Sequence, residues 1–195
     1  MILSQKLANH RIILASASPR RRQLLEGLGL KFEVLVRDVP EIVPETLSRH
    51  QIPLFLAELK SSAFQAQEFG PNSLIITADT IVWLKQAMLN KPKNYEDAVQ
   101  MLSLISGQTH QVFTGVCIKT NSEQHTFYAE SKVKFRELSR EEIDYYIATC
   151  QPFDKAGAYG IQEWVGYIGI EHIEGSFYNV MGLPTQMLYK ELMKL

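Results

Sequence analysis

Short apolar blocks alternate with stretches of helical spacing along the chain. Blocks of about four to eight apolar residues are typical of buried strands, whereas apolar residues three and four apart are typical of helices. In the first half this pattern predicts, in chain order, a strand over 12–15, a helix through Leu24, Leu25 and Leu28 closed by Gly29, a strand over 32–36, a helix from about Pro53 to Phe69, and buried β structure over 74–84. Strands and helices therefore alternate from the start.

The second half continues with well-bounded helices and a hairpin. Its predicted elements are a helix from about Tyr95 to Ile105 that ends at Ser106-Gly107, a hairpin of 110–120 with 126–135, a helix over 140–149, a glycine-rich loop over 154–162, a strand near 167–173 and a last helix from Pro184. We expect a mixed α/β fold. Its twisted sheet contains parallel and antiparallel pairs, and its helices flank the sheet in two lobes around a cleft.

Length and composition favour a single domain over 1–195. The chain is long enough for a sizeable core, and no repeat or flexible linker divides it. Lys and Arg number 20 against 21 Asp and Glu, so no global field attracts nucleic acid or membranes, and any anion site must be local. Cys117 and Cys150 lack the spacing of a zinc site, and no apolar run suits a signal peptide or membrane span. We expect a cytoplasmic protein that binds neither nucleic acid nor membranes.

The turn after the first predicted strand carries an unusual charge. Ser18 is a favourable N-cap and Pro19 a favourable first helical residue, so three arginines, 20–22, fall in the first helical turn. Each cation there forgoes roughly 0.3 to 1 kcal/mol, because a helix N-terminus is partially positive. A bound anion held by backbone N–H groups, serine hydroxyls and guanidinium groups explains the arrangement. Alternatively, the arginines are solvated or pair with distant acids, above all Arg22, which could point outward.

Two charged residues stand in apolar surroundings. Asp79 interrupts the apolar run 74–82, where a carboxylate is costly to bury unless a cation pairs with it. It is therefore a candidate metal ligand or general base, and the alternative is an acid at a turn or bulge. Lys60 shares a helical stripe with Leu56 and Phe64 at four-residue spacing, and the alternative for it is a stem that snorkels to solvent.

Three further segments carry candidate polar groups. Glu41 lies in an acidic, proline-containing loop for which exposure is the default, and Lys91 precedes Pro92. Lys155 lies in the glycine-rich loop, which we expect to be flexible enough to close on a ligand. Several cations and a partly buried acid together suit a triphosphate with a divalent metal. The phosphate-loop, dinucleotide, serine-elbow and zinc-protease motifs are missing from the sequence, and we expect its histidines to be structural or exposed and its cysteines to be core residues.

The order of these segments resembles a known family. The segments are 14–21 (LASASPRR), 78–82 (ADTIV), 91–92 (KP), 106–110 (SGQTH), 154–162 (DKAGAYGIQ) and 173–184 (IEGSFYNVMGLP). Spread over nearly the whole chain, they resemble the Maf family of nucleoside triphosphate pyrophosphatases, once named for septum formation. The segment 154–162 resembles the branch that acts on dTTP and UTP rather than the branch that acts on 7-methyl-GTP.

The resemblance implies a fold, a cofactor and roles. The fold is similar to that of the inosine triphosphate pyrophosphatases, the cofactor is a divalent cation (Mg or Mn), and the protein is a cytoplasmic homodimer. Asp79 is implied as the proton acceptor and, with Glu41, as a metal ligand. The residues implied in choosing the base are Arg20, Thr80 and Gln162. Those implied at the phosphates are Ser16, Arg21, Lys60, Lys91 and Lys155. A glutamine offers both a donor and an acceptor, which suits the edge of uracil or thymine.

The chain departs from the family pattern at three places. Pro40-Glu41 replaces the usual acidic pair, which weakens any role that needs two adjacent acids. Glu163-Trp164 stands where small residues often follow the position of Gln162, so we expect a different rim of the base pocket. The segment 87–90 lacks the frequent glycines, which we expect to alter only a hairpin.

Two other functions stay open at this point. One is a pyrophosphatase for purine or modified nucleotides on the same scaffold. The other is a nucleotide-binding regulator of cell division without meaningful turnover. The acid at position 79 argues against the regulator, because a carboxylate weakens triphosphate binding unless a metal is recruited.

Overall fold

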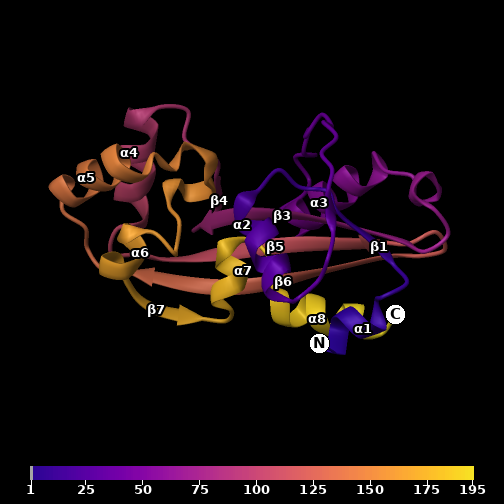
Figure 1. Cartoon of the computed structure of the whole chain (residues 1–195). Coiled ribbons are helices and arrows are strands. Elements are labelled where there is room, and N and C mark those ends of the chain that lie inside the picture. The colour runs from indigo at the N-terminus through magenta and orange to yellow at the C-terminus, as the bar shows by residue number, and fades with distance from the viewer. Residues whose placement is uncertain (1) are drawn as a thin grey trace. The chain divides into compact units, whose positions relative to one another are not determined.

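A computed structural model describes residues 2–195 and contains one seven-stranded sheet (Figure 1). The strands are β1 (Arg11–Leu14), β2 (Glu33–Val34), β3 (Ser73–Leu84), β4 (Ala87–Leu89), β5 (Thr109–Lys119), β6 (Gln124–Phe135) and β7 (Ile170–Glu174). The α-helices are α1 (Ile2–Lys6), α2 (Pro19–Gly27), α3 (Gln51–Ser62), α4 (Tyr95–Ile105), α5 (Arg140–Cys150), α6 (Trp164–Gly169), α7 (Phe177–Met181) and α8 (Thr185–Leu192). Short 3₁₀ turns are η1 (Ala66–Phe69), η2 (Pro152–Asp154) and η3 (Ala156–Ala158).

The sheet mixes parallel and antiparallel pairs. Its strand order is β2-β1-β3-β5-β6-β7, with β4 paired to β3. Strand β1 runs parallel to both β2 and β3, with Leu14 beside Ile76, whereas β3 with β4 and β6 with β7 are antiparallel. This confirms the predicted mixed α/β class. Within residues 2–195, no helix is long and apolar enough to cross a membrane.

The chain divides into two compact units. Unit 1 consists of Met1–Asp79, Thr114–Ala129 and Gly182–Leu195, and unit 2 consists of Thr80–Phe113 and Glu130–Met181. Strand β3 passes from the first unit to the second between Asp79 and Thr80. That the chain acts as one domain over 1–195 stays a prediction.

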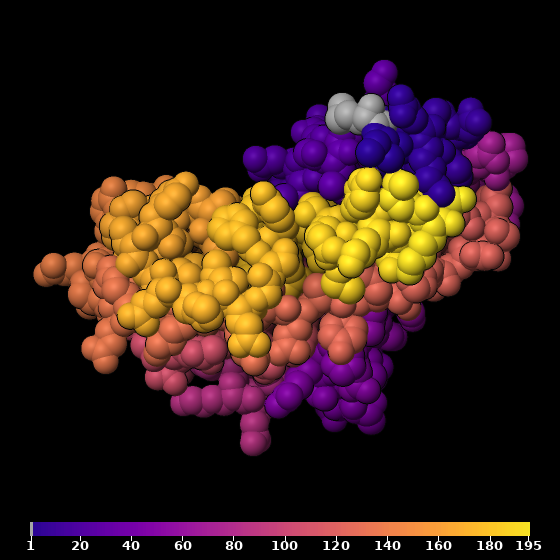
Figure 2. All heavy atoms as spheres, turned by 90° about the horizontal axis from the view of Figure 1, so that it is seen from below, coloured from indigo at the N-terminus to yellow at the C-terminus, as the bar shows by residue number. Residues whose placement is uncertain are grey.

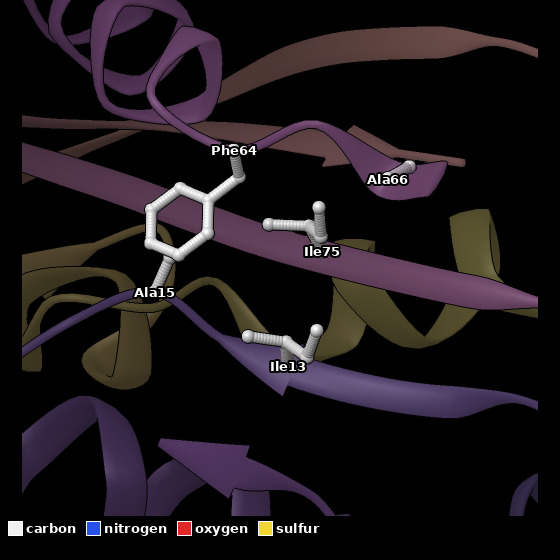
Figure 3. Packing of buried hydrophobic residues seen from close by; sticks show 5 residues of the cluster. All are labelled: Ile13, Ala15, Phe64, Ala66 and Ile75. Carbon is white, nitrogen blue, oxygen red and sulfur yellow. The ribbon is translucent and has the colours of Figure 1, made fainter. Parts of the chain in front are cut away.

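The core of unit 1 lies where β1 and β3 meet the segment after α3. Ile13 and Ile75 come from these two parallel strands, and Phe64 and Ala66 follow α3 (Figure 3). The Phe64 ring lies beside Ala15, and each of these five residues is buried. Burial of a large apolar side chain contributes roughly 1.5–3 kcal/mol, so this cluster anchors the chain after α3 to the sheet. Elsewhere in the unit, the C-terminal segment lies beside the N-terminal one (Figure 2).

Helix α3 is held closely against the sheet of unit 1. A Cβ on Gly115 of β5 would lie 2.4 Å from the carbonyl of Pro53, so the helix backbone packs where only glycine fits. The Thr77 hydroxyl of β3 donates to the Ala57 carbonyl at 2.7 Å. These contacts determine where the last turn of α3, which carries Lys60, lies.

The prediction of one helix from 53 to 69 is wrong. Helix α3 ends at Ser62, and a separate 3₁₀ turn, η1, covers Ala66–Phe69. Lys119 of β5 donates to the Phe64 carbonyl at 2.7 Å and to the Ser61 carbonyl at 3.4 Å, which satisfies carbonyls at the helix end. The helical spacing of apolar residues continues through Phe64, although Phe64 now packs in the core beyond the helix.

Unit 2 packs α4 and α5 together (Figure 1). Helix α4 begins and ends as predicted, and its N-cap, Asn94, accepts a hydrogen bond from the Asp97 N–H at 2.9 Å. In the same unit, the buried rings of His110, Phe135 and Tyr159 lie in contact. The expectation of a structural histidine holds for His110.

Two segments of unit 2, 167–173 and 87–90, carried predictions about local structure. The strand expected near 167–173 begins only at Ile170, because Trp164–Gly169 form the short helix α6. A Cβ on Gly166 would lie 1.8 Å from the Ile161 carbonyl oxygen, so the glycine permits a close turn there. The glycine-poor segment 87–90 does form a hairpin, in which Lys85 adopts a left-handed backbone with φ 56°.

Candidate functional site

The turn after β1 has the capped geometry that its sequence predicts. The Ser18 hydroxyl accepts the Arg21 N–H at 3.4 Å, and Pro19 is the first residue of α2. The Ser16 hydroxyl, which is buried, accepts the Ser18 N–H at 3.2 Å and one Arg21 guanidinium N–H at 3.5 Å. Serine hydroxyls and a guanidinium group therefore gather at the start of the helix.

Arg21 is half-buried, and its orientation is fixed. Its Nε donates to the Gly182 carbonyl at 2.8 Å. Desolvation lowers the pKa of the Arg21 guanidinium, the carboxylates of Asp79 and Glu41 act in the opposite direction, and the charge of Arg20 lowers it further. An arginine nevertheless stays protonated in a protein. Unit 1 therefore holds a partly desolvated cation in the field of two carboxylates and a second arginine.

The three arginines of the turn differ in exposure. Arg22 is exposed and pairs with Glu26 one helical turn later, Nε to Oε1 at 2.9 Å. It points outward, as the alternative for this residue predicts. Arg20 and Arg21 are half-buried.

Lys60 stands between two carboxylates in unit 1. Its ammonium lies 2.5 Å from Asp79 Oδ1 and 3.1 Å from Glu41 Oε1. The side chains of Lys60 and Asp79 are 19% and 14% exposed, whereas that of Glu41 is 49% exposed. The topology explains why Asp79 and the arginine turn belong to the same region of unit 1. Strands β1 and β3 are parallel, so the residues after Leu14 and those after Ile76 leave the paired segment in the same direction.

The carboxylates of Glu41 and Asp79 fit the donor chemistry of a magnesium or manganese ion. Both offer hard oxygen ligands, and both lie within reach of one cation, the Lys60 ammonium. Within residues 2–195, no group of three or more His, Cys, Asp or Glu side chains is arranged to hold a metal ion. Magnesium is commonly bound by one or two carboxylates together with substrate phosphates, so a pair of carboxylates is compatible with a site that the substrate completes.

Unit 2 contains the remaining predicted residues. Thr80 is half-buried on β3, Lys91 is exposed, and Gln162 is half-buried at the end of the glycine-rich loop. The loop is tied to the segment before Lys91, because the Gly157 N–H donates to the Asn90 carbonyl at 3.1 Å. The structure thus places these residues in the second unit, while Ser16, Arg20, Arg21, Glu41, Lys60 and Asp79 belong to the first.

Lys155 is buried and engaged by two acids. Its ammonium lies 2.7 Å from Asp154 Oδ1 and 3.0 Å from Glu163 Oε1, and its side chain is 9% exposed. A flexible lysine that closes on a ligand was expected from the loop sequence. In the structure the side chain is instead paired inside the unit.

Glu163 also pairs with Tyr146, and this contact was not predicted from the sequence. The Tyr146 hydroxyl of α5 donates to Glu163 Oε2 and accepts the Gly160 N–H at 3.0 Å. Tyr146 gave no signal, because it falls on the ordinary apolar stripe of α5 with Ile143 and Ile147. Glu163 did give a signal in the sequence, because it is an acid at a position where the family often has small residues.

The fold places the chain among α/β proteins of a known type. The solved structure of the Staphylococcus aureus Ham1 protein aligns with 93% of this chain and 99% of its own, with a TM-score of 0.50 and 17% sequence identity. This likeness concerns the fold alone.

The sequence comparisons assign the family. Residues 11–195 match the family model described as Maf-like protein. A protein of Phocaeicola vulgatus named dTTP/UTP pyrophosphatase is 54% identical over 98% of this chain and 99% of its own. Proteins of the same name from Bacteroides thetaiotaomicron and Flavobacterium johnsoniae are 53% and 50% identical, and each alignment covers at least 97% of both chains. This chain belongs to the Maf-like protein family.

Proposed function

We propose that this protein is a nucleoside triphosphate pyrophosphatase that hydrolyses dTTP and UTP to the monophosphate and diphosphate. The observation that carries the proposal is the Lys60 ammonium held between Asp79 and Glu41, in the unit that also contains the capped arginine turn. The relatives named dTTP/UTP pyrophosphatase support the same reaction and the same bases.

The phosphate-binding residues in this proposal are Ser16, Arg21, Lys60, Lys91 and Lys155. In unit 1 the support is the half-buried guanidinium of Arg21, which lies beside the buried Ser16 hydroxyl. A partly desolvated cation binds phosphate oxygens more strongly than an exposed one, because less water screens it. In unit 2, two of the three N–H donors of the Lys155 ammonium serve Asp154 and Glu163, and the third is the one proposed to contact phosphate.

Asp79 is the proposed proton acceptor. The Lys60 ammonium contacts Oδ1 of this carboxylate and orients it, and the proposed acceptor of the water proton is Oδ2. The water oxygen bonds to the α-phosphorus, its proton goes to Asp79, and the bond between the α-phosphorus and the bridging oxygen breaks, so that pyrophosphate leaves. A divalent cation bound by Asp79 and Glu41 would neutralise charge on the phosphates.

Arg20, Thr80 and Gln162 are the proposed base-selecting residues. Gln162 has a physical argument of its own: its Oε1 is buried and has no hydrogen-bond partner among residues 2–195. An unmet buried acceptor costs about 1–3 kcal/mol, and the N3–H of uracil or thymine supplies the missing donor.

Three further properties belong to this proposal. The cation is Mg or Mn, in line with the oxygen ligands of Asp79 and Glu41. A cytoplasmic location agrees with the free thiols of Cys117 and Cys150. A homodimer and a role in cleansing the nucleotide pool or arresting cell division rest on the family resemblance alone.

A panel of triphosphates tests the proposed activity. The protein is incubated with dTTP, UTP, dCTP, dATP and dGTP in magnesium or manganese, and pyrophosphate and orthophosphate are both quantified. We expect pyrophosphate from dTTP and UTP and little from the others, and no pyrophosphate from the Asp79→Asn variant, which should keep its fold by circular dichroism. Asp144→Asn, at an exposed pair with Arg140, is the matched control and should retain activity. Near-normal turnover by Asp79→Asn would contradict the assignment of Asp79 as the proton acceptor.

A further inference from the structure

A hydrogen-bond network in unit 2 ties the glycine-rich loop 154–162, called the Gln162 loop below, to α5. The Tyr146 hydroxyl bridges the Gly160 N–H and Glu163 Oε2, and Glu163 Oε1 contacts the Lys155 ammonium. Tyr146 is fully buried, and burial, together with the Glu163 carboxylate, raises the pKa of its phenol, so the proton stays on the hydroxyl. The network therefore holds the loop at positions 155 and 160 through Tyr146 and through Glu163, the residue that follows the loop.

The loop has little freedom between these points. A Cβ on Gly160 would lie 2.7 Å from Glu163 Cδ, so the carboxylate packs directly on the loop backbone. Ala158 has a left-handed backbone with φ 60°, which is unfavourable for a non-glycine residue and persists only where the surroundings hold it. These two features indicate a loop kept in one conformation by its contacts with Glu163 and α5.

Gln162 lies inside this fixed segment. It directly precedes Glu163, and its buried Oε1 lacks a hydrogen-bond partner within residues 2–195. This acceptor therefore has no donor among the described residues.

A glutamine by itself does not distinguish uracil from cytosine. Rotation of its amide exchanges the acceptor and the donor, so it can face the N3–H of uracil or the N3 acceptor of cytosine. Selection against cytosine requires that the acceptor be held toward the base, because a site with fixed hydrogen-bonding groups rejects an analogue that leaves them unpaired. The contacts that hold the loop thus decide selectivity.

We infer that Tyr146 and Glu163 are positioning residues that hold the Gln162 loop so that its amide accepts from uracil or thymine and rejects cytosine. This inference rests on the proposed function. It gives Glu163 a positioning role at a place where the family often has small residues. It gives Tyr146, a buried residue of α5, the same role through its contacts with Gly160 and Glu163.

The test measures the ratio of kcat/KM for dTTP to kcat/KM for dCTP. Tyr146→Phe keeps the ring and removes the hydroxyl, and Glu163→Gln keeps the shape and removes the charge. We expect the ratio to fall by about tenfold or more in each variant, because a mobile amide serves both bases. The matched control is Tyr145→Phe, at the exposed neighbouring tyrosine of α5, which should leave the ratio unchanged.

Amide hydrogen exchange supplies a readout that does not depend on turnover. In the nucleotide-free protein, exchange across 154–163 should quicken in Tyr146→Phe and Glu163→Gln but not in Tyr145→Phe. If Tyr146→Phe does not fold, Glu163→Gln decides the matter alone. An unchanged ratio in a folded variant overturns the inference, and so does an equal loss with both nucleotides. Failure of the proposed function is distinct, because the wild-type protein would then release no pyrophosphate from dTTP.

Discussion

A lysine shared by two acids is the central feature at the residue scale. The Lys60 ammonium lies within 3.1 Å of both Glu41 and Asp79, so its positive charge offsets the repulsion between the two carboxylates. We propose the less exposed acid, Asp79, as the proton acceptor, because β3 and the lysine fix its position, whereas Glu41 lies on an exposed loop.

A buried histidine gives a pH prediction at the same scale. His110 Nε2 lies 2.7 Å from the Tyr159 hydroxyl, and burial lowers the pKa of His110 to about 4 from 6.5. The unfolded chain therefore takes up this proton below pH 6.5, while the folded protein does so only near pH 4. We expect about 2 kcal/mol of the free energy of unfolding to be lost on this account between pH 7 and pH 4.5. Urea denaturation at the two pH values measures the loss.

Other groups also titrate over this range, so the histidine contribution is read from variants. His110→Gln should show a smaller loss of stability on acidification than the wild type, whatever its stability at pH 7. His172→Gln, at an exposed position on β7, should lose as much as the wild type. The same pH dependence in His110→Gln and wild type would contradict the assignment.

Sequence reasoning succeeds at residues whose geometry is local. The cap at Ser18 and the outward Arg22 depend on neighbours within one helical turn, and both were predictable. That Asp79 needs a cationic partner was predictable from the cost of burying a carboxylate. The identity of that partner was not, because Lys60 lies on another element. Tyr146 could not be predicted, since its spacing suits an apolar core residue and only tertiary contact makes its hydroxyl useful.

Helix α3 shows how one close contact positions a functional element. Gly115 lets the Pro53 backbone approach where a Cβ would lie at 2.4 Å, so Gly115→Ala must displace the helix or the strand. We expect a loss of about 1–3 kcal/mol in the free energy of unfolding and a lower kcat, because α3 carries Lys60. Thermal denaturation and the pyrophosphate assay measure the two effects.

Gly27 is the matched control for this substitution. A Cβ there meets nothing within 4 Å, and the residue ends helix α2 with an ordinary backbone. Gly27→Ala should therefore leave stability unchanged or raise it by up to about 1 kcal/mol. Equal stability of Gly115→Ala and Gly27→Ala would rule out the close approach of α3 to β5.

Elements were predictable where their ends are marked by nearby residues. Helix α4 has its cap at Asn94 and its stop at Ser106-Gly107, and its bounds were anticipated. The end of α3 was not, because the Lys119 side chain that satisfies its last carbonyls comes from β5. Helix α6 was mistaken for strand, since its β-branched and aromatic composition hides the close turn at Gly166.

At the scale of the whole molecule, fold and family rest on different evidence. The likeness to the Ham1 protein, at 17% identity, concerns the path of the chain. The Maf-like family model covers 11–195, and relatives above 50% identity align over nearly the full length. With a formal net charge of −1, any anion binding must depend on local groups, and the ones we propose in unit 1 are Ser16 and Arg21 at the start of α2.

Hydrolysis of dTTP in ¹⁸O-labelled water tests the central claim most directly. The reaction is run with the wild-type protein and magnesium, and mass spectrometry locates the label in the products. The account predicts dTMP carrying one ¹⁸O and unlabelled pyrophosphate, because water attacks the α-phosphorus. Label in pyrophosphate or orthophosphate, with unlabelled nucleotide, would mean attack at the β- or γ-phosphorus and would contradict the account.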